Sequence, residues 1–306
     1  MELEGKPSSI GTPISEVEID AALVYRLLEN QHADLKHLPI HLVDSGWDNA
    51  MFRLGDELSV RLPRRKIAAS LLENEQTWLP ILADRLFLPV PTPYRVGKPA
   101  QGYPWPWSVL PWLPGVTADL EEPHANQAKC FASFLRSLHV PAPFNAPSNA
   151  FRGVPLQQRA ASVEERMQRL KAKTNPIDRE IENAWNVALN APVDVEATWL
   201  HGDLHPRNVL VVNGAIAGII DWGDMTSGDI ATDIAAIWML FGDRNARQRA
   251  IVEYTNASEA TLQRAKGWAI LFGVVFLDTG LIDNPRNALI GEKILRRVSE
   301  SGRLLK

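Results

Sequence analysis

The chain begins with a helical pattern of apolar residues. Ser15 and Glu18 have the spacing of a capping box, the side-chain arrangement that starts many helices. Apolar residues then recur at helical intervals between Ile19 and Leu27. The pattern predicts a first amphipathic helix that ends near Asn30.

Three short runs with extended character follow, at residues 38–43, 49–54 and 57–62. Gly55 and Asp56 lie between the last two runs and are typical of a two-residue hairpin turn. These runs predict the antiparallel meander of a small sheet.

The next segment predicts a helix and then a proline-rich connection. Leucines interspersed with glutamates over residues 67–86 are typical of a helix that packs on a sheet, and Pro80 is expected to kink or split it. Prolines repeat over residues 89–114 and exclude a regular helix there. We place the connection between two lobes in this stretch, with residues 107–113 as its last strand.

The rest of the chain has mainly helical apolar spacing. The expected helices cover residues 122–139, 156–173, 178–190, 230–241, 261–281 and 286–298. A β-rich insertion interrupts them at residues 198–222, where Asn213 and Gly214 close a hairpin. The whole pattern predicts an α+β protein with a small antiparallel-sheet lobe, residues 1–113, and a larger, mostly helical lobe, residues 114–306.

The composition is that of a folded protein, and its acidic balance leaves room for cationic small molecules. The chain has 306 residues, 45% of them hydrophobic and 22% charged, which is enough for a sizeable core. A formal net charge of -4 provides no basic field for nucleic acid or for an anionic membrane. We therefore expect neither as a partner.

Three further features indicate a cytoplasmic location. Cys130 is the only cysteine, so no internal disulfide can form. The N-terminal sequence has no basic segment followed by an apolar run. The most apolar stretch, residues 268–277, is well short of the roughly 20 residues that span a bilayer, so we expect a buried core helix.

The chemically richest stretch surrounds the hairpin of the insertion. It reads His-Gly-Asp-Leu-His-Pro-Arg-Asn-Val-Leu over residues 201–210, and Ile-Ile-Asp-Trp follows at residues 219–222. A hairpin returns its two ends to one place, so Asn208 and Asp221 can direct oxygens at one hard cation, for which Mg²⁺ is the natural candidate. Asp203 would lie beside it and could accept a proton from an attacking hydroxyl. This arrangement suits phosphoryl transfer.

These motifs resemble those of the aminoglycoside phosphotransferase family, small-molecule kinases that are distantly similar to protein kinases. The step from Asp203 to Asn208 is that of the kinase catalytic loop H-R-D-x-x-x-x-N, and Asp221 stands where the D-F-G aspartate follows. The resemblance implies a two-lobed, protein-kinase-like fold. It also implies that Asp203 is the catalytic base, while Asn208 and Asp221 bind Mg²⁺.

The resemblance assigns nucleotide-binding residues to the first lobe. Ser45 and Asn49 belong to a turn that resembles the family's phosphate-covering loop. Arg61 occupies the position where most kinases have lysine, and Glu75 on the following helix is its expected partner. Arginine can bind phosphate oxygens in a bidentate manner, so function is compatible with this departure. Glu73 is the alternative partner if the helix register differs.

The last strand of the first lobe resembles the strand and hinge that contact the nucleobase. By position, Pro111 would offer a carbonyl and Leu113 an amide to the base, with Leu110 behind it. Two residues of the second lobe receive structural roles. We expect Asp233 to accept hydrogen bonds from the catalytic-loop backbone and His201 to orient that loop as a packed side chain.

The sequence therefore predicts a Mg²⁺-dependent enzyme that moves the γ-phosphate of ATP or GTP to a hydroxyl of a small molecule, such as an aminoglycoside antibiotic that is thereby inactivated. A cationic acceptor of this kind calls for an acidic cleft, for which Asp224, Asp278 and Asp283 are candidates, although Asp224 is also suited to a turn. The family also contains choline, homoserine, methylthioribose and macrolide kinases, and the motifs do not separate these acceptors.

Two hypotheses from other classes stay open at this point. His201, Asp203, His205 and Asp221 could bind zinc or a pair of metal ions for hydrolysis. That hypothesis leaves Arg61 and the hinge without a role. A catalytically silent, kinase-like binding module is the other alternative, because arginine is unusual at position 61.

Overall fold

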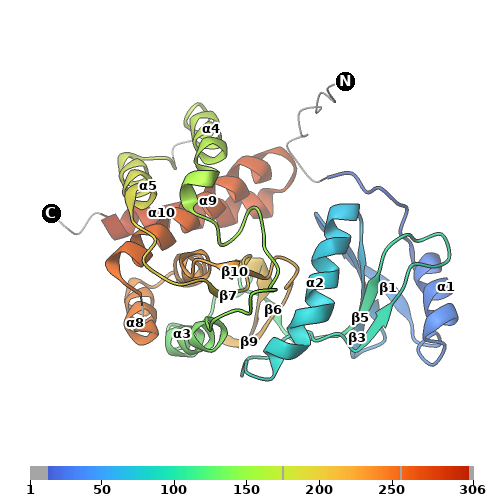
Figure 1. The fold of residues 1–306 in the computed structure, drawn as a ribbon. Helices are drawn as coiled ribbons and strands as arrows, with labels where there is room; N and C mark the ends of the chain where they lie inside the picture. The colour runs from blue at the N-terminus through green and yellow to red at the C-terminus, as the bar shows by residue number, and fades with distance from the viewer. Residues whose placement is uncertain (1–12, 174–175, 256, 303–306) are drawn as a thin grey trace.

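The computed structural model describes residues 13–173, 176–255 and 257–302, and for Ser45 the backbone alone. It has two lobes, seen in Figure 1 as a sheet region on the right and a mostly helical region on the left. The elements of the N-terminal lobe are α1 (Ala21–Gln31), β1 (Ile40–Ser45), β2 (Asn49–Leu54), β3 (Leu58–Pro63), α2 (Lys66–Ala83), β4 (Arg95–Gly97) and β5 (Trp107–Pro111).

The five strands form one antiparallel sheet in the order β1-β2-β3-β5-β4. Strand β2 covers the predicted residues, and β1 and β3 begin slightly later than predicted. Strand β4 was not predicted as a separate element, because it is only three residues long and lies within the proline-rich stretch. The meander predicted from the alternation is therefore confirmed, with one additional edge strand.

The start of α1 differs from the prediction. The side chain of Asp20, not Ser15, caps this helix, and its Oδ1 accepts a hydrogen bond from the backbone of Leu23 at 2.7 Å. The hydroxyl of Ser15 instead donates to the carbonyl of Val17 at 2.7 Å. The capping-box prediction was wrong because a second capping residue stood closer to the apolar run. Helix α2 continues through Pro80, so the predicted split does not occur.

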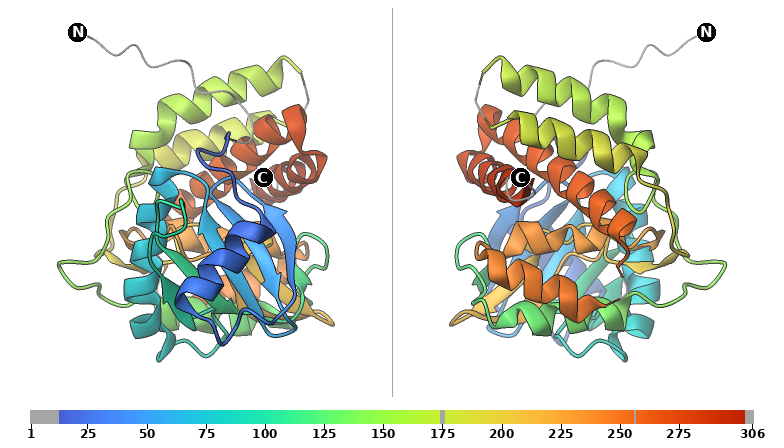
Figure 2. Two further views of the ribbon diagram at one scale, coloured as in Figure 1. Left: turned by 90° about the vertical axis from the view of Figure 1, so that its right-hand side faces the viewer. Right: turned by 90° about the vertical axis from the view of Figure 1, so that its left-hand side faces the viewer.

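The two faces of the sheet have different tasks. Figure 2 shows α1 lying across the outer face, where Val60 and Leu62 of β3 join its leucines in one apolar core. Side chains alternate along a strand, so Ser59 and Arg61 point to the opposite face, toward α2. Both are buried there, at 2% and 5% exposure. The alternation of side chains along β3 thus places Arg61 in the interior between the two lobes.

The C-terminal lobe begins after a short connection from β5, and the predicted lobe boundary at residue 113 lies within that connection. Its elements are β6 (Val116–Thr117), α3 (Gln127–Leu138), the 3-10 turn η1 (Leu156–Arg159), α4 (Ala160–Lys171), α5 (Arg179–Asn190), β7 (Thr198–Leu200), the 3-10 turn η2 (Pro206–Asn208), β8 (Val209–Val212), β9 (Ala215–Ile219), β10 (Thr226–Gly228), α6 (Ala231–Ile234), α7 (Ala236–Leu240), α8 (Arg244–Tyr254), α9 (Glu259–Asp283) and α10 (Pro285–Gly302).

Most predicted helices are present, with two differences. The segment predicted as one helix over residues 230–241 consists of α6 and α7, with Ala235 between them. Helix α8 was not predicted, because its sequence is largely polar; Asp243 caps it by accepting from the backbone of Ala246 at 2.6 Å. The predicted hairpin is confirmed as β8 and β9, and β6 adds a third strand beside it.

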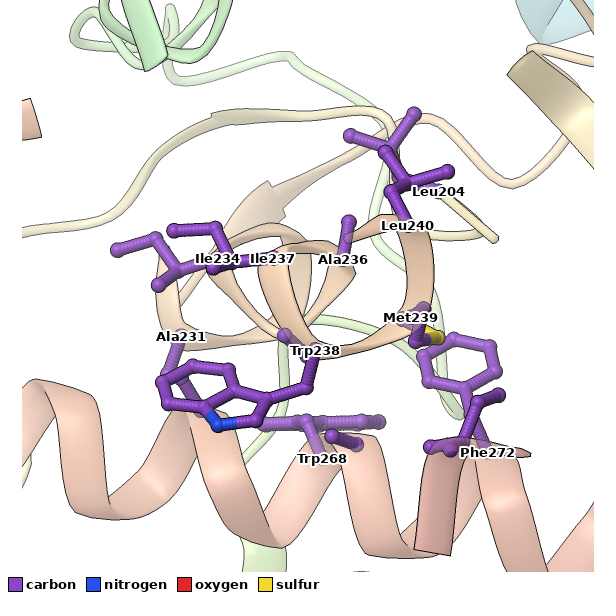
Figure 3. Packing of buried hydrophobic residues seen from close by; sticks show 14 of the residues in the cluster. Leu204, Ala231, Ile234, Ala236, Ile237, Trp238, Met239, Leu240, Trp268 and Phe272 are labelled. Atoms are coloured by element: carbon purple, nitrogen blue, oxygen red, sulfur yellow. The ribbon is translucent and has the colours of Figure 1, made fainter. Parts of the chain in front are cut away.

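Helix α9 is the central helix of this lobe. It is long and apolar enough to cross a membrane by length and composition, but 72% of its most apolar window is buried inside the protein. Figure 3 shows Trp268 and Phe272 of this helix together with Trp238 of α7. All three residues belong to the same buried apolar cluster. The structure confirms residues 268–277 as part of a core helix.

Candidate active site

An ion-pair group joins the N-terminal sheet to the C-terminal lobe. Arg61 on β3 donates from Nη1 to Glu75 Oε2 on α2 at 2.6 Å, and from Nη2 to Asp221 Oδ1. Asn49 on β2 lies against the same guanidinium, and its amide oxygen, once turned toward it, accepts from Nη2 at 3.0 Å and from Nε at 3.1 Å. The structure brings these four predicted site residues together. Glu73, the alternative partner, is exposed.

The charges of this group depend on burial and on each other. Burial disfavours the charged form of Arg61, but Glu75 and Asp221 outweigh it and hold the pKa of Arg61 above its usual range. Burial also raises the pKa of Glu75, which Arg61 and the backbone N–H of Trp222 offset in part. Asp221 is 49% exposed, so the ion-pair group has one side open to solvent. Arg61 therefore stays a cation at the edge of an accessible space.

The catalytic-loop backbone is held by Asp233 of α6. Its Oδ2 accepts from the backbone of His201 at 2.7 Å and its Oδ1 accepts from Gly202 at 2.9 Å. The ring of His201 is fully buried; its Nε2 bonds to the carbonyl of Ile220 at 3.0 Å, and its Nδ1 accepts from the backbone of Asp203 at 3.2 Å. Burial lowers the pKa of His201. The structural roles predicted for Asp233 and His201 are confirmed.

Asp203 lies among three polar side chains. Its Oδ1 accepts from Arg152 Nη2 at 2.7 Å, and its Oδ2 lies 3.2 Å from His205 Nε2 and 3.3 Å from Asn208 Nδ2. Burial alone would raise the pKa of Asp203, but the charges of His205 and Arg152 outweigh burial and hold it well below its usual range. Asp203 is therefore an ionised carboxylate at neutral pH, although only 16% of its side chain is exposed.

The hairpin brings the predicted metal ligands to one end. Val209 pairs with Ile219, and the backbone of Ile220 donates to the carbonyl of Asn208 at 2.9 Å. Asp221 follows directly, with a positive φ of 62° that turns the chain away from the strand. Asn208 uses Nδ2 to bond the carbonyl of Asp203 at 2.9 Å, and no described residue donates to its Oδ1.

The predicted base-contacting residues lie at the end of β5. Leu110 is 2% exposed, whereas Pro111 and Leu113 are half-buried. Trp112 donates its backbone N–H to Glu57 at 2.7 Å, while no described backbone group accepts from Leu113. The amide of Leu113 therefore has the freedom that the predicted contact needs. The side chain of Ser45 lies outside the described residues.

The three acidic candidates for a cationic acceptor do not form an open acidic surface. Asp278 on α9 is 6% exposed and is paired with Arg166 and Arg169 of α4 at 2.7 and 2.8 Å. Asp283 is an exposed residue at the end of α9. Only Asp224 lies close to Asp203; its carboxylate accepts from Asn149 at 2.7 Å, and burial raises its pKa to about 6.

Sequence reasoning missed Arg152, although it contacts Asp203, the predicted catalytic base, directly. It lies in the irregular segment before η1, far from the motifs in sequence, so no spacing connects it with Asp203. Its Cβ packs beside Gly202, whose positive φ of 82° and crowded surroundings leave no room for a larger residue. Only the three-dimensional fold places it in the site.

The geometry does not support the hydrolase hypothesis. Both ring nitrogens of His201 are occupied by backbone bonds, and the ring packs on Trp222 with centroids 4.6 Å apart. Across the described part of the chain, no group of three or more His, Cys, Asp or Glu side chains is arranged to hold a metal ion. His201 is thus a positioning residue of the loop.

Comparisons with known proteins agree with this arrangement. Over 92% of this chain and 99% of the other, the fold matches the GDP complex of aminoglycoside 2'-phosphotransferase-IIIa, with a TM-score of 0.68 and 17% identity. It also matches a macrolide 2'-phosphotransferase from Brachybacterium faecium, over 90% and 97% of the two chains, with a TM-score of 0.59 and 16% identity. The two-lobed, kinase-like fold predicted from the sequence is therefore confirmed.

The model of the phosphotransferase enzyme family matches residues 39–268, more than half of the chain, and the protein belongs to that family. An aminoglycoside 3'-phosphotransferase of Escherichia coli is 26% identical over 51% of this chain and 59% of its own length. A homoserine kinase of Gluconobacter oxydans is 28% identical over 64% and 63%. The chain spans less than two thirds of the length of these relatives.

Proposed function

We propose that this protein transfers the γ-phosphate of ATP or GTP to a hydroxyl group of a small molecule with the help of Mg²⁺. One observation carries the proposal: the loop with Asp203 and Asn208 lies beside Asp221, which is itself bonded to the buried pair of Arg61 and Glu75. Phosphoryl transfer in kinases needs these parts together: a phosphate-binding cation with its glutamate, metal-binding oxygens and an aspartate for the acceptor.

The N-terminal lobe would bind the nucleotide. Arg61 is fixed by Glu75, and its guanidinium can turn donors from Asp221 or Asn49 toward phosphate oxygens when the nucleotide binds. The turn that contains Ser45 and Asn49 would cover the phosphates on the side of the N-terminal sheet. Leu110, Pro111 and Leu113 would hold the base through apolar contact and backbone hydrogen bonds. Solved relatives in GDP and ADP complexes support a nucleoside phosphate donor of either base.

Asn208 and Asp221 fit a magnesium ion. Mg²⁺ prefers oxygen ligands, and both residues offer them without displacing a structural bond. The amide nitrogen of Asn208 is bonded to Asp203, which leaves its Oδ1 available, and half of the Asp221 side chain is exposed. When bound, the ion would neutralise charge on the phosphates.

Asp203 would orient the acceptor hydroxyl and receive its proton. A carboxylate oxygen has lone pairs beyond those that Arg152 and His205 use, so it can also accept from a substrate hydroxyl. A pKa below the usual range makes Asp203 a weak base. Weak basicity suffices, because the loose transition state of phosphoryl transfer depends on position and charge more than on deprotonation.

The acceptor belongs to the small molecules that such relatives take. Solved relatives bind kanamycin, streptomycin and gentamicin, which supports the aminoglycoside hypothesis, and the homoserine kinase supports a metabolite instead. A metabolite or an antibiotic would meet the enzyme in the cytoplasm, where nucleoside triphosphates are abundant. A silent binding module is less consistent with the site, because Asp203, Asn208 and Asp221 are all in place.

The experiment measures thermal stability with ATP or GTP, with and without Mg²⁺. A ligand present at about 100 times its Kd stabilises the folded protein by about 2.7 kcal/mol, which is readily measured. We expect stabilisation by at least one Mg²⁺–nucleotide complex. Asp221→Asn should remove the Mg²⁺-dependent part, whereas Asp56→Asn in the exposed β2–β3 turn should not.

Phosphoryl transfer to hydroxyl compounds is measured on the same samples. Stabilisation that requires both nucleotide and Mg²⁺, together with transfer to one acceptor, would establish the kinase. If neither nucleotide stabilises the protein and none is consumed, the proposed function is wrong.

A further inference from the structure

Arginines border the catalytic aspartate on the side of α4 and α9. Arg152 donates to Asp203 Oδ1 at 2.7 Å, and its guanidinium lies 4.9 Å from the ring centroid of Phe272 on α9. A guanidinium has five N–H donors. The contact with Asp203 uses Nη2, and no described residue accepts a hydrogen bond from Nη1 or Nε. Arg152 therefore has its Nη1 donors uncommitted beside the proposed catalytic carboxylate, while its Nε is buried without a partner.

Arg159, at the end of η1, is the second arginine of this group. Its guanidinium lies 4.9 Å from the ring centroid of Phe151, and the side chain is half-buried. Among the described residues, none forms a hydrogen bond or an ion pair with it, and its Nε is buried without a partner. A half-buried cation without a counter-ion is costly, because it has lost hydration and gained nothing in return.

Other arginines make the position of Arg159 less favourable. Burial lowers the pKa of Arg159, and repulsion by Arg152 and Arg166 lowers it further. The nearby carboxylate of Asp278 is already paired with Arg166 and Arg169, and the exposed Glu165 is paired with Arg169, so neither carboxylate offsets Arg159. The group of Arg152, Arg159, Arg166 and Arg169, called here the arginine cluster, thus has more cations than buried carboxylates.

The protein can pair a buried arginine when structure requires it. Arg264 on α9 is 1% exposed, and it donates from Nε to Asp229 Oδ2 at 2.6 Å and from Nη2 to Asp229 Oδ1 at 3.1 Å. Asp194 accepts a further bond from the same guanidinium at 3.1 Å. Arg264 thus has the carboxylates of Asp229 and Asp194 as partners within the fold, whereas Arg159 has no carboxylate partner among the described residues.

We propose that the acceptor of this enzyme carries an anionic group, a carboxylate or a phosphate, which binds to Arg159 and Arg152 while its hydroxyl faces Asp203. The inference rests on the proposed function, since it names the substrate class of that site. An anion at this place would supply the missing counter-charge, and the rings of Phe151 and Phe272 hold the guanidinium faces so that the N–H edges stay available. A polycationic acceptor would instead meet repulsion.

The test compares hydroxyl compounds that differ in charge. 3-Phenyllactate is compared with its neutral amide, and glycerate and glycerol 3-phosphate are compared with glycerol and 3-amino-1,2-propanediol; kanamycin represents the polycations. The measurement is kcat/KM for phosphoryl transfer or, where transfer is too slow, the thermal shift caused by the compound in the presence of Mg²⁺ and ADP. Carboxylates and phosphates are scored separately, which identifies the anion.

We expect at least one anion to exceed its neutral counterpart by about tenfold or more, as for a hydrogen bond between charged groups. Arg159→Met should remove most of this preference, and Arg159→Lys should retain part of it. Arg249→Met, at an exposed position on α8, is the matched control and should retain the full preference.

Two results would overturn the inference. One is that no anion exceeds its neutral counterpart in either measurement, or that a cation is preferred. The other is that Arg159→Met leaves the ratio between anion and amide unchanged. Stabilisation by Mg²⁺ and nucleotide is measured in the same plates without acceptor, so failure of the inference and failure of the kinase function give different results.

Discussion

The two sides of the proposed active site, the nucleotide side around Arg61 and the acceptor side around Asp203, balance charge in opposite ways. On the nucleotide side one guanidinium, that of Arg61, lies between two carboxylates, Glu75 and Asp221. On the other side Arg152 shares the carboxylate of Asp203 with His205, and Arg159 has no counter-ion among the described residues. The nucleotide side is complete within the fold, apart from the metal and the phosphates. On the other side Asp203 offsets Arg152, and the proposed anionic acceptor would supply the counter-charge that Arg159 lacks.

The difference follows from what each arginine must do. Arg61 on β3 is paired with Glu75 on α2 and with Asp221 after β9, so its ion pairs connect the two lobes within the fold. Arg152 and Arg159 belong to an irregular segment and a short 3-10 turn at the surface of the C-terminal lobe. Ligand sites are commonly less well satisfied than structural sites, because the ligand provides part of the interaction energy.

The largest expected effect comes from Asp203, the residue on the acceptor side that is proposed to receive the proton of the acceptor hydroxyl. Asp203→Asn keeps the shape of the side chain but removes its charge, and the loss of a positioned proton acceptor costs about 10²- to 10⁴-fold in rate. We expect kcat to fall by that factor, while stabilisation by nucleotide and Mg²⁺ is kept. Equal losses of kcat and of nucleotide binding would show that Asp203 acts on the nucleotide side.

The next effect is on the stability of the nucleotide side. Glu75→Leu leaves Arg61 buried with the half-exposed Asp221 and removes the acceptor of the Trp222 N–H. Breaking one side of a buried ion pair costs about 3–5 kcal/mol. Urea unfolding should show a loss of this size, and Glu73→Leu, two positions away on the exposed face of α2, should show little change. Similar values for the two variants would contradict the structural role of the pair.

The raised pKa of Asp224, which lies near Asp203 on the acceptor side, predicts how the stability of the protein depends on pH. Burial raises its pKa to about 6 from the ordinary 3.8, and Asp203 adds to the shift while Arg152 opposes it. The folded protein therefore binds this proton more tightly than the unfolded chain does. The stability from this group is complete below the unfolded pKa of 3.8 and is lost as the pH rises through about 6.

Asp224→Asn cannot ionise and can still accept from Asn149. Unfolding free energies measured without metal or nucleotide should therefore favour the variant increasingly as the pH rises from about 4 to about 7. A constant difference between the two proteins over this range would mean that Asp224 titrates as in the unfolded chain.

The sequence was informative about the nucleotide side because that side is local in sequence or repeats a known spacing. The resemblance to kinases assigned Arg61 and its partner Glu75, and the structure shows why the spacing works: Arg61 lies opposite Val60 and Leu62 on β3, and Glu75 is buried on α2. The hairpin predicted that Asn208 and Asp221 meet at one end. In each case a regular strand, helix or hairpin determines where a side chain lies from its position in the sequence.

The acceptor side could not be predicted in the same way. Arg152 and Arg159 precede Asp203 by about fifty residues and have no periodic relation to it, and the contact of Arg152 with Asp203 depends on how the segment before η1 packs on the loop of Asp203. The acidic cleft inferred from family resemblance was a poor guide for the same reason. Asp278 looked available in sequence, but two arginines from α4 neutralise it.

The smallest expected effect tests whether the arginine cluster costs stability in the free protein. Arg159→Met keeps an apolar side chain against Phe151 but removes a charge that Arg152 and Arg166 repel. We expect unfolding free energy to rise by up to about 1 kcal/mol, with Arg159→Lys nearer to the wild type. Added salt should reduce the gain, because it screens the repulsion.

A gain in stability together with weaker binding of an anionic acceptor would mark Arg159 as a residue kept for function at a cost to the fold. The two effects have opposite signs, and a purely structural arginine would not produce them, since its removal lowers stability. If Arg159→Met is instead less stable than Arg159→Lys, charge at this position stabilises the free protein. The proposed contrast would then be wrong, because Arg159 would not need an anionic ligand to balance its charge as Arg61 is balanced by Glu75 and Asp221.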